Sequence, residues 1–388
     1  MTSTKNKKVP KLRFPDFTGE WKREQFGAIA DITSGGTPSR TNPAYWNGDI
    51  NWVTTSEINR SFILLASQKI TQLGLENSSA KVFPKNTILV AMYGQGQTRG
   101  RAAILGIEAT TNQACAALKI KEFALPLFVL HNLNRRYDEL RNLSNDGSQK
   151  NLSTGLIKAL CIFFPSIPEQ QKIADFLTSV DKKIEQLNKK KELLEKYKKG
   201  CMQKIFSQDI RFKDDNGNGF PDWEEKKLGD VCLKISSNIS ANTLENNYGI
   251  YKIYGATGYL QNVDFYQEEE PYISIVKDGA GVGRILLCEA KSSVLGTLDK
   301  LRQKNKNNLH FLYFLISQIE FDKYTTGSTI PHIYFKDYSK EEINLPHPDE
   351  QKKIAEFLSS IDKKIELVDK EIELAKSFKK GLLQLMFV

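Results

Sequence analysis

Two long segments of the chain alternate apolar and polar residues with a spacing that is typical of helices. Apolar residues in these segments step by four and three, and charged residues fill most positions between them. This heptad spacing predicts the seam of a coiled coil rather than a lone surface helix. The seam of the first segment is Ile173, Leu177, Val180, Ile184, Leu187, Leu194, Cys201 and Ile205, and that of the second is Ile354, Leu358, Ile361, Ile365, Val368, Ile372, Ala375, Leu382 and Met386.

The two segments are also near-copies of each other. Glu169–Phe206 aligns without gaps onto Glu350–Phe387, and a repeat this long indicates a domain duplication. Lysines interrupt the seams at Lys191, Lys198 and Lys379. The helices could pack on each other or each on its own domain, and their shared register favours the first arrangement. About 37 residues at 1.5 Å per residue would make a rod of about 55 Å.

A globular region precedes each helical segment. A weaker repeat opens each region, as "RFPDFTGEW" from Arg13 and "RFKDDNGNGFPDW" from Arg211. Short β-like runs between glycine-rich turns follow, and then a helix-like segment. We predict an α+β fold with β-rich domains at 1–164 and 207–345 and helical spacers at 165–206 and 346–388. Strands are expected at 50–54, 87–91, 102–105, 272–276 and 284–287, and shorter helices at 125–143 and 309–324.

Composition narrows the class of protein. The 388 residues are enough for two domains with separate cores. No apolar run approaches the roughly 20 residues of a membrane helix, and the basic N-terminal stretch lacks the apolar part of a signal peptide. We therefore expect a cytoplasmic protein with no membrane partner. The five separated cysteines argue against a disulfide framework, and the net charge of +9 hints at a polyanionic partner.

Two glycine-rich runs end in arginine. "YGQGQTRGR" from Tyr93 and "KDGAGVGR" from Lys277 each lie between two β-like runs, so hairpin turns are expected. Neither run is a Walker A sequence or a dinucleotide-binding fingerprint. Backbone N–H groups together with Arg99, Arg101 or Arg284 could bind a DNA phosphate or a base edge, and turns without a ligand are the alternative.

Catalytic motifs are missing from the sequence. The "NPAY" run at 42–45 is similar to the Asn/Asp-Pro-Pro-aromatic motif of amino-methyltransferases, but Ala44 replaces the second proline, so a turn before a strand is the better interpretation. The four histidines lack metal-ligand spacing, and no acidic nuclease cluster or serine elbow is present. We expect a chain that is no enzyme by itself and binds no cofactor.

Several stretches of the chain resemble the DNA-specificity subunit of type I restriction–modification systems, a means of phage defence through DNA methylation. The resemblance covers essentially the whole chain, although the second globular region lacks a clear copy of the "GGTP" run. Its most specific element is a doubled Pro-x-x-x-Glu-Gln sequence before the long helices, at Pro165–Gln170 and Pro346–Gln351. The other matching stretches are "SGGTPSRTNPAYWNGDINWVTTSEI" from Ser34, "TTNQACAAL" from Thr110 and "YGATGYL" from Tyr254.

The resemblance implies two target recognition domains and two long helices that pack as an antiparallel coiled coil, with pseudo-two-fold symmetry. Each domain would read one half of a split, asymmetric site on double-stranded DNA. Two methyltransferase (modification) subunits would dock on the chain and supply S-adenosylmethionine chemistry. Restriction subunits would add ATP- and Mg-dependent translocation and cleavage, so these cofactors are expected on partner subunits.

Loop residues are the candidates for DNA contacts. Lysine and arginine suit phosphates, and polar side chains suit base edges. A turn or cap hydrogen bond is an equally good role for each serine and threonine. The candidates are Thr37, Ser39, Arg40, Gln95, Gln97, Arg99, Arg101, Ser148, Gln149 and Lys150 in the first domain, and Lys277, Arg284, Ser328, Thr329 and His332 in the second. The candidates for the spacer and for partner docking are Ile173, Leu177, Val180, Ile184, Leu187, Ile354, Leu358, Ile361, Ile365 and Val368.

A rod of the predicted size would let the two domains face one side of the duplex about one turn, or about 34 Å, apart. Two other classes of protein remain open. One is a coiled-coil scaffold that never binds DNA, against which the basic charge counts mildly. The other is a self-contained nuclease or methyltransferase, against which the missing catalytic motifs count.

Overall fold

The computed structural model describes residues 8–94, 97–143, 151–244 and 249–388. The candidates Gln95, Ser148, Gln149 and Lys150 therefore lie outside the described residues. The chain divides into two compact units, which do not follow chain order: unit 1 comprises Met1–Asn188 and Lys370–Val388, and unit 2 comprises Lys189–Asp369. Each unit therefore contains part of both long helices.

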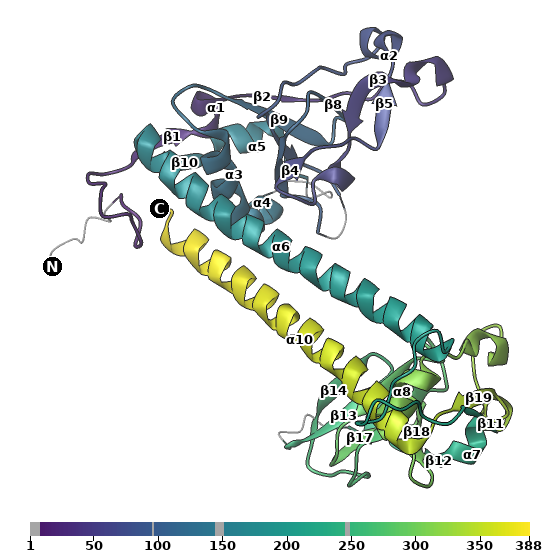
Figure 1. The fold of residues 1–388 in the computed structure, drawn as a ribbon. Coiled ribbons are helices and arrows are strands. Elements are labelled where there is room, and N and C mark those ends of the chain that lie inside the picture. The colour runs from purple at the N-terminus through teal and green to yellow at the C-terminus, as the bar shows by residue number, and fades with distance from the viewer. Residues whose placement is uncertain (1–7, 95–96, 144–150, 245–248) are drawn as a thin grey trace. The chain divides into compact units, whose positions relative to one another are not determined.

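The long helices predicted from the heptad spacing are confirmed. Helix α6 spans Ile167–Phe206 over 40 residues, and helix α10 spans Pro348–Leu385 over 38 residues (Figure 1). Among the described residues, no helix combines the length and apolar character needed to cross a membrane.

Unit 1 is built on a five-stranded sheet in the order β2-β9-β6-β7-β4, accompanied by a three-stranded sheet β5-β3-β8 and a strand pair β1-β10. Its strands are β1 Lys22–Gln25, β2 Ala30–Ser34, β3 Trp46–Val53, β4 Phe62–Ile63, β5 Gln68–Ile70, β6 Ile88–Ala91, β7 Ala102–Leu105, β8 Thr110–Thr111, β9 Cys115–Ile120 and β10 Cys161–Phe164. Its shorter helices are α1 Phe26–Ile29, η1 Pro43–Tyr45, η2 Thr55–Glu57, α2 Gln72–Glu76, α3 Pro126–Arg135, α4 Tyr137–Asn142 and α5 Thr154–Ala159.

Unit 2 repeats this plan with a four-stranded sheet β12-β18-β15-β16, a three-stranded sheet β14-β13-β17 and a pair β11-β19. Its strands are β11 Glu224–Lys227, β12 Cys232–Ser236, β13 Tyr251–Gly255, β14 Gly258–Val263, β15 Tyr272–Val276, β16 Ile285–Cys288, β17 Ser292–Val294, β18 Leu298–Gln303 and β19 Glu342–Leu345. Its shorter helices are α7 Leu228–Val231, η3 Ala241–Thr243, α8 Leu309–Ile316, η4 Phe321–Tyr324 and α9 Phe335–Tyr338.

Both predicted hairpins are confirmed, because β6 pairs antiparallel with β7 and β15 pairs antiparallel with β16. The prediction of one continuous helix at 125–143 was wrong. The chain leaves helical geometry at Arg136, which divides α3 from α4 and turns its guanidinium to Glu139 and to the Cys161 carbonyl oxygen. The predicted helix at 309–324 likewise ends at Ile316, where the Ser317 hydroxyl donates to the Phe314 carbonyl oxygen.

The ends of the long helices complete the cores of the two units. In unit 1, Leu382 and Leu383 of α10, and Met386 just after it, are buried in the same cluster as Ile173 and Leu177 of α6. A trio of aromatic rings closes each core at centroid distances of 5.0 to 6.4 Å. The trio is Trp21, Phe128 and Phe387 in unit 1 and Trp223, Phe311 and Phe206 in unit 2.

The Glu-Gln pair at the start of each long helix ties that helix to its unit. The carboxylate of Glu169, only 2% exposed, accepts two hydrogen bonds from Arg13, at 2.7 and 2.8 Å. Glu350 binds Arg211 in the same way, at 2.8 and 2.9 Å. The adjacent Gln170 accepts a hydrogen bond from the Leu125 backbone N–H, immediately before α3. A buried, bidentate pair of this kind requires both partners, which explains the repeated motif.

The lysines that interrupt the seams find aspartates on the facing helix. Lys379 pairs with Asp181 in unit 1 at 2.5 Å. In unit 2, Lys198 pairs with Asp362 at 2.6 Å and Lys191 with Asp369 at 2.7 Å. Polar seam positions fix helix register and orientation. Within each unit, therefore, the two helices run antiparallel and pack on each other as well as on the domain.

Candidate nucleic-acid interface

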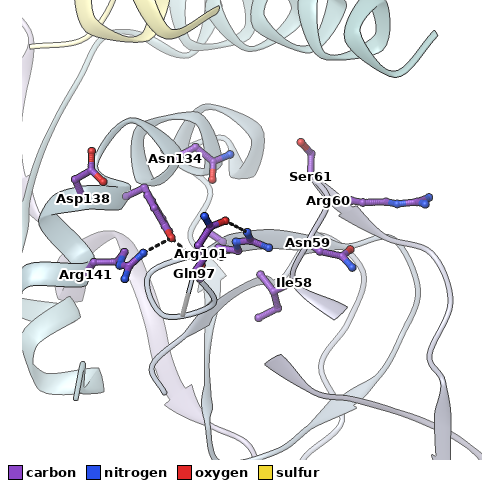
Figure 2. Close-up of a pocket in the computed structure, with 11 residues that line it drawn as sticks. Ile58, Asn59, Arg60, Ser61, Gln97, Arg101, Asn134, Asp138 and Arg141 are labelled. Carbon is purple, nitrogen blue, oxygen red and sulfur yellow. Dashed lines mark hydrogen bonds between the residues drawn. The ribbon is translucent and has the colours of Figure 1, made fainter. Parts of the chain in front are cut away.

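An open hollow of about 660 Å³ in unit 1 gathers basic and amide side chains (Figure 2). We call it the arginine pocket. It lies between the segment after η2, the start of β7, and helices α3 and α4. Its lining residues are Ile58, Asn59, Arg60, Ser61, Gln97, Arg101, Ala102, Asn134, Tyr137, Asp138 and Arg141.

Hydrogen bonds hold the β6–β7 turn against α4. The Tyr137 hydroxyl donates to the Gln97 carbonyl oxygen at 2.7 Å, and Arg141 Nη1 donates to the Tyr137 hydroxyl at 3.0 Å. Arg101 Nη2 donates to Gln97 Oε1 at 3.2 Å, as Figure 2 shows. Gly100 has a φ of +86°, and a Cβ there would lie 3.2 Å from the Arg141 backbone nitrogen. Glycine therefore lets the turn approach the helix closely.

The charges of the arginine pocket are not compensated. In the described part of the chain, no carboxylate pairs with Arg60, Arg101 or Arg141, and Asp138 is the single acidic residue among those lining the hollow. The nearby Arg99 has a buried Nε with no hydrogen-bond partner. Unpaired guanidinium groups around a hollow are suited to bind phosphate oxygens, which accept in the same bidentate geometry as carboxylates.

The candidates Thr37, Ser39 and Arg40 lie in the segment between β2 and η1. Thr37 donates to Gln113 Oε1, and the hydroxyls of Ser39 and Thr41 are 2.8 Å apart. Arg40 lies over the rings of Trp46 and Trp52, beside a second hollow of about 460 Å³. We call this hollow the indole pocket; its lining residues are Arg40, Trp46, Asn47, Gly48, Ala66, Ser67, Gln68 and Lys69.

In unit 2 the candidates form one loop cluster in which most charges are paired. Lys277 lies 3.2 Å from Asp299, and His332 Nδ1 lies 2.7 Å from Asp278. Arg284 donates to the Ala256 carbonyl oxygen at 2.7 Å. Backbone hydrogen bonds between Thr326 and His332 close a small hairpin with Ser328 and Thr329 exposed at its tip. The two candidate loops meet where the Ile333 N–H donates to the Lys277 carbonyl oxygen.

Sequence reasoning missed most of the residues that line the arginine pocket. Gln97 and Arg101 were candidates, but Arg60, Asn134, Tyr137 and Arg141 were not. Arg60 reaches the hollow from a segment about 40 residues away from Arg101 in sequence, which only the tertiary fold brings near. The run "RRYDELR" after α3 is a usable signal, because it places Tyr137 and Arg141 four residues apart on one helical face.

The spacer candidates lie on the buried or half-buried side of the long helices α6 and α10. Ile173, Leu177 and Leu187 of α6 are buried, and Val180 and Ile184 are half-buried. On α10, Ile365 is half-buried and the remaining four candidates are buried; these four are Ile354, Leu358, Ile361 and Val368.

The outer surface of both helices carries a repeated apolar pair. Leu193 and Tyr197 of α6 are 53% and 54% exposed. The repeat maps them onto Leu374 and Phe378 of α10, which are 71% and 56% exposed. The members of each pair stand four residues apart, so they share a helical face.

Two units that share one arrangement of sheets and helices but carry different loops define a two-domain recognition protein. The family model for the type I restriction modification DNA specificity domain matches residues 18–196 and 221–376. The chain therefore belongs to this family, and its role is to recognise DNA sequence as a specificity subunit.

Known relatives agree with this assignment. The chain is 26% identical to the type I restriction enzyme MjaIX specificity subunit of Methanocaldococcus jannaschii over an alignment of 402 positions that covers 94% of this chain and 92% of the relative. The MjaVIII specificity subunit of the same organism is 33% identical over 196 residues, 47% of this chain and 46% of that protein. The fold is similar to the crystal structure of a type I restriction–modification S subunit from M. genitalium, with a TM-score of 0.66 and 18% identity over 98% of this chain and 99% of that one.

Proposed function

We propose that this chain is the non-catalytic reading subunit of a type I restriction–modification complex. Each unit reads one half of a bipartite, asymmetric site on double-stranded DNA, and the long helices hold two copies of a modification subunit. Restriction subunits join through the modification subunits. The observation that carries the proposal is a duplicated frame whose two units have unlike loop surfaces.

The arginine pocket supports phosphate binding by unit 1. Among the described residues, only neutral groups contact Arg101 and Arg141, and Arg60 has no hydrogen-bond partner, so the charges of all three stay available to a polyanion. Contacts of this kind give affinity that falls steeply with salt but do not select a sequence. Sequence must then be read by side chains that reach base edges in the grooves.

The contrast between the units supports an asymmetric site. The strands of the two units follow one order, but the loops at their β-hairpin ends carry different residues. Unit 1 presents Gln97, Arg99 and Arg101 in its β6–β7 turn, whereas unit 2 presents Lys277 and Arg284 at the equivalent β15–β16 turn. Two different sets of side chains on one frame suit two different half-sites.

The repeated apolar pairs support docking of two copies of one partner. Leu193 with Tyr197, and Leu374 with Phe378, offer apolar area on an otherwise charged helix surface. Aromatic side chains are enriched at protein interfaces, and exposed apolar patches mark interaction sites. We propose that a modification subunit covers each pair.

We place S-adenosylmethionine, ATP and Mg on the partner subunits. No group of three metal-ligating side chains comes together within the described ranges. The residues of the arginine pocket are cationic or neutral except for Asp138, a set suited to phosphate rather than to a divalent cation.

The proposal is tested by co-expressing this chain with its methyltransferase partner and measuring binding to a cognate duplex by mobility shift. Methylome sequencing of a host with and without the chain supplies the target. We expect one bipartite methylated motif that depends on the chain. A complex that assembles but shifts no duplex, and adds no methylated motif, would establish the scaffold alternative instead.

A further inference from the structure

We propose that Arg40 reads a guanine in the half-site bound by unit 1. The inference rests on the proposed function and adds a specificity-determining residue to it. Arg40 is exposed and follows Ser39 in the segment between β2 and η1. Its guanidinium carbon lies 3.7 Å from the ring centroid of Trp46 and 4.8 Å from that of Trp52.

The two indoles form a rigid seat for the guanidinium. Their rings are perpendicular, with centroids 5.0 Å apart, and Trp52 is buried. Each indole uses its one N–H to hold the approaching segment: Trp46 donates to the Ser39 carbonyl oxygen and Trp52 to the Gly36 carbonyl oxygen, both at 3.0 Å. Stacking on aromatic faces orients an arginine without using its hydrogen-bond donors.

Most donors of Arg40 remain free. Its Nη1 donates to Gln68 Oε1 at 2.7 Å, and in the described part of the chain its other guanidinium donors have no partner. A guanidinium carries five N–H donors. The free donors lie at the indole pocket, whose other polar side chains are Asn47, Ser67, Gln68 and Lys69.

The structural arginines of the same protein are satisfied quite differently. Arg13 binds both oxygens of Glu169 and the carbonyl oxygens of Thr18 and Gly19. Arg136 binds both oxygens of Glu139 and the Cys161 carbonyl oxygen. Among the described residues, Arg40 has no carboxylate and no backbone carbonyl partner, so holding the fold together does not account for its position on the two indoles.

Guanine matches the arrangement better than a phosphate does. A phosphate can accept from a lysine, or from an arginine in many orientations, so a phosphate contact does not require a seat that fixes the guanidinium. Lys69 and the arginine pocket already offer such contacts. A guanidinium fixed in one plane, with one edge held by an amide and the other free, has the geometry to donate two parallel hydrogen bonds to guanine O6 and N7. The seat therefore assigns Arg40 to base reading in the major groove.

The test compares the complex containing wild-type chain with complexes containing Arg40→Lys, which keeps the charge and loses the fork, and Gln68→Ala, which frees one edge of the fork. Methylomes identify the motif, and mobility shifts then use duplexes in which each base pair of the half-sites is replaced in turn. We expect Arg40→Lys to lose discrimination of roughly tenfold or more at one G·C pair and to leave the other positions unchanged. Gln68→Ala should weaken discrimination at that same pair by a smaller factor.

Three outcomes decide the matter. Equal loss of affinity for all duplexes with Arg40→Lys would make Arg40 a phosphate contact and overturn the inference. Unchanged discrimination, with a thermal unfolding midpoint below that of the wild type, would make it a structural residue and also overturn it. If the wild-type complex itself prefers no duplex, the proposed function fails. If the wild-type complex prefers its duplex but the Arg40 variant behaves as in either case above, only the assignment of Arg40 fails.

Discussion

At equivalent positions of the two long helices, a lysine of the heptad seam lies close to a different side chain in unit 1 and in unit 2. In unit 2, Lys198 lies over the ring of Phe314 at 5.0 Å, a favourable cation–π contact. In unit 1 the repeat maps Lys198 onto Lys379, and the structurally equivalent position of α3 is His131. Burial, and to a lesser extent the charge of Lys379, lowers the pKa of His131 to about 3. The lysine contact of unit 2 is therefore insensitive to pH, whereas the equivalent contact of unit 1 is sensitive to it.

The candidate DNA-contact residues of the two units also differ in how their charges are balanced by neighbouring carboxylates. Among the described residues, unit 1 leaves Arg60, Arg101 and Arg141 without carboxylate partners, whereas unit 2 pairs Lys277 with Asp299 and His332 with Asp278. Partial neutralisation lowers the contribution of a cation to phosphate binding. The comparison teaches that both units share the buried Glu–Arg pair and the aromatic trio, whereas the contact of the seam lysine and the exposed charges differ.

The largest effect is expected at the buried pair that both units keep. Glu350→Gln leaves the Arg211 guanidinium without its carboxylate in a site where Glu350 is fully buried. We expect a loss of about 3 kcal/mol in the free energy of unfolding, because the partly buried Arg211 keeps only Asp222, 3.9 Å away, as an acidic partner. Chemical denaturation of the full chain measures this, with unit 2 followed by hydrogen exchange.

Glu169→Gln is the matched change in unit 1 and should cost a similar amount through Arg13. Lys353→Ala removes the exposed pair with Asp215 and should cost less than about 1 kcal/mol. Equal losses for Glu350→Gln and Lys353→Ala would show that the buried pair does not anchor the helix start.

The next effect concerns partner docking on the repeated apolar pairs. Replacing Leu374 and Phe378 with glutamate should remove one modification subunit and leave the other, because burying two such side chains contributes about 3 kcal/mol or more. Leu193→Glu with Tyr197→Glu should remove the other copy. Native mass spectrometry of the co-expressed complex counts the copies.

Lys199→Glu supplies the control for this experiment, since Lys199 is exposed on α6 but lies two residues after Tyr197, on a different face of the helix from Leu193 and Tyr197. Retention of two copies by both double variants would place the partner on another surface of the chain.

A smaller, pH-dependent effect is expected at His131. Because its folded-state pKa of about 3 lies below the ordinary value of 6.5, the unfolded state binds the proton between these values and the folded state does not. The stability of unit 1 should therefore fall as pH drops below about 6.5, by up to about 1.4 kcal/mol per pH unit. His131→Phe introduces the residue that unit 2 has at the equivalent position, Phe314, and should flatten the dependence of stability on pH.

The reciprocal variant Phe314→His should introduce the same acid sensitivity into unit 2, beside Lys198. Hydrogen exchange at pH 7 and pH 5 separates the two units. Equal acid slopes for the wild type and His131→Phe would mean that another group governs the response.

The sequence predicted what depends on local periodicity. The heptad spacing located both long helices, and the glycine-rich runs located both β-hairpins, because these patterns are set by neighbouring residues. The aspartate partners of the seam lysines were not foreseen, since pairing Asp181 with Lys379 requires the register of two distant segments. Arg60 and Arg141 were missed for the same reason, because the tertiary fold alone brings them to one hollow.

The smallest effect is expected for Arg99, a candidate already identified from sequence. Its Nε is buried without a hydrogen-bond partner beside the arginine pocket, so the folded protein gains little from the guanidinium. Arg99→Ala should leave stability nearly unchanged and weaken binding to a cognate duplex roughly tenfold at fixed salt, as one lost arginine contact to DNA does. Lys189→Ala on α6, where the lysine pairs only with Glu192, should leave DNA affinity unchanged. Equal affinities of the two variants in a titration would remove Arg99 from the reading surface and leave the pocket to Arg60, Arg101 and Arg141.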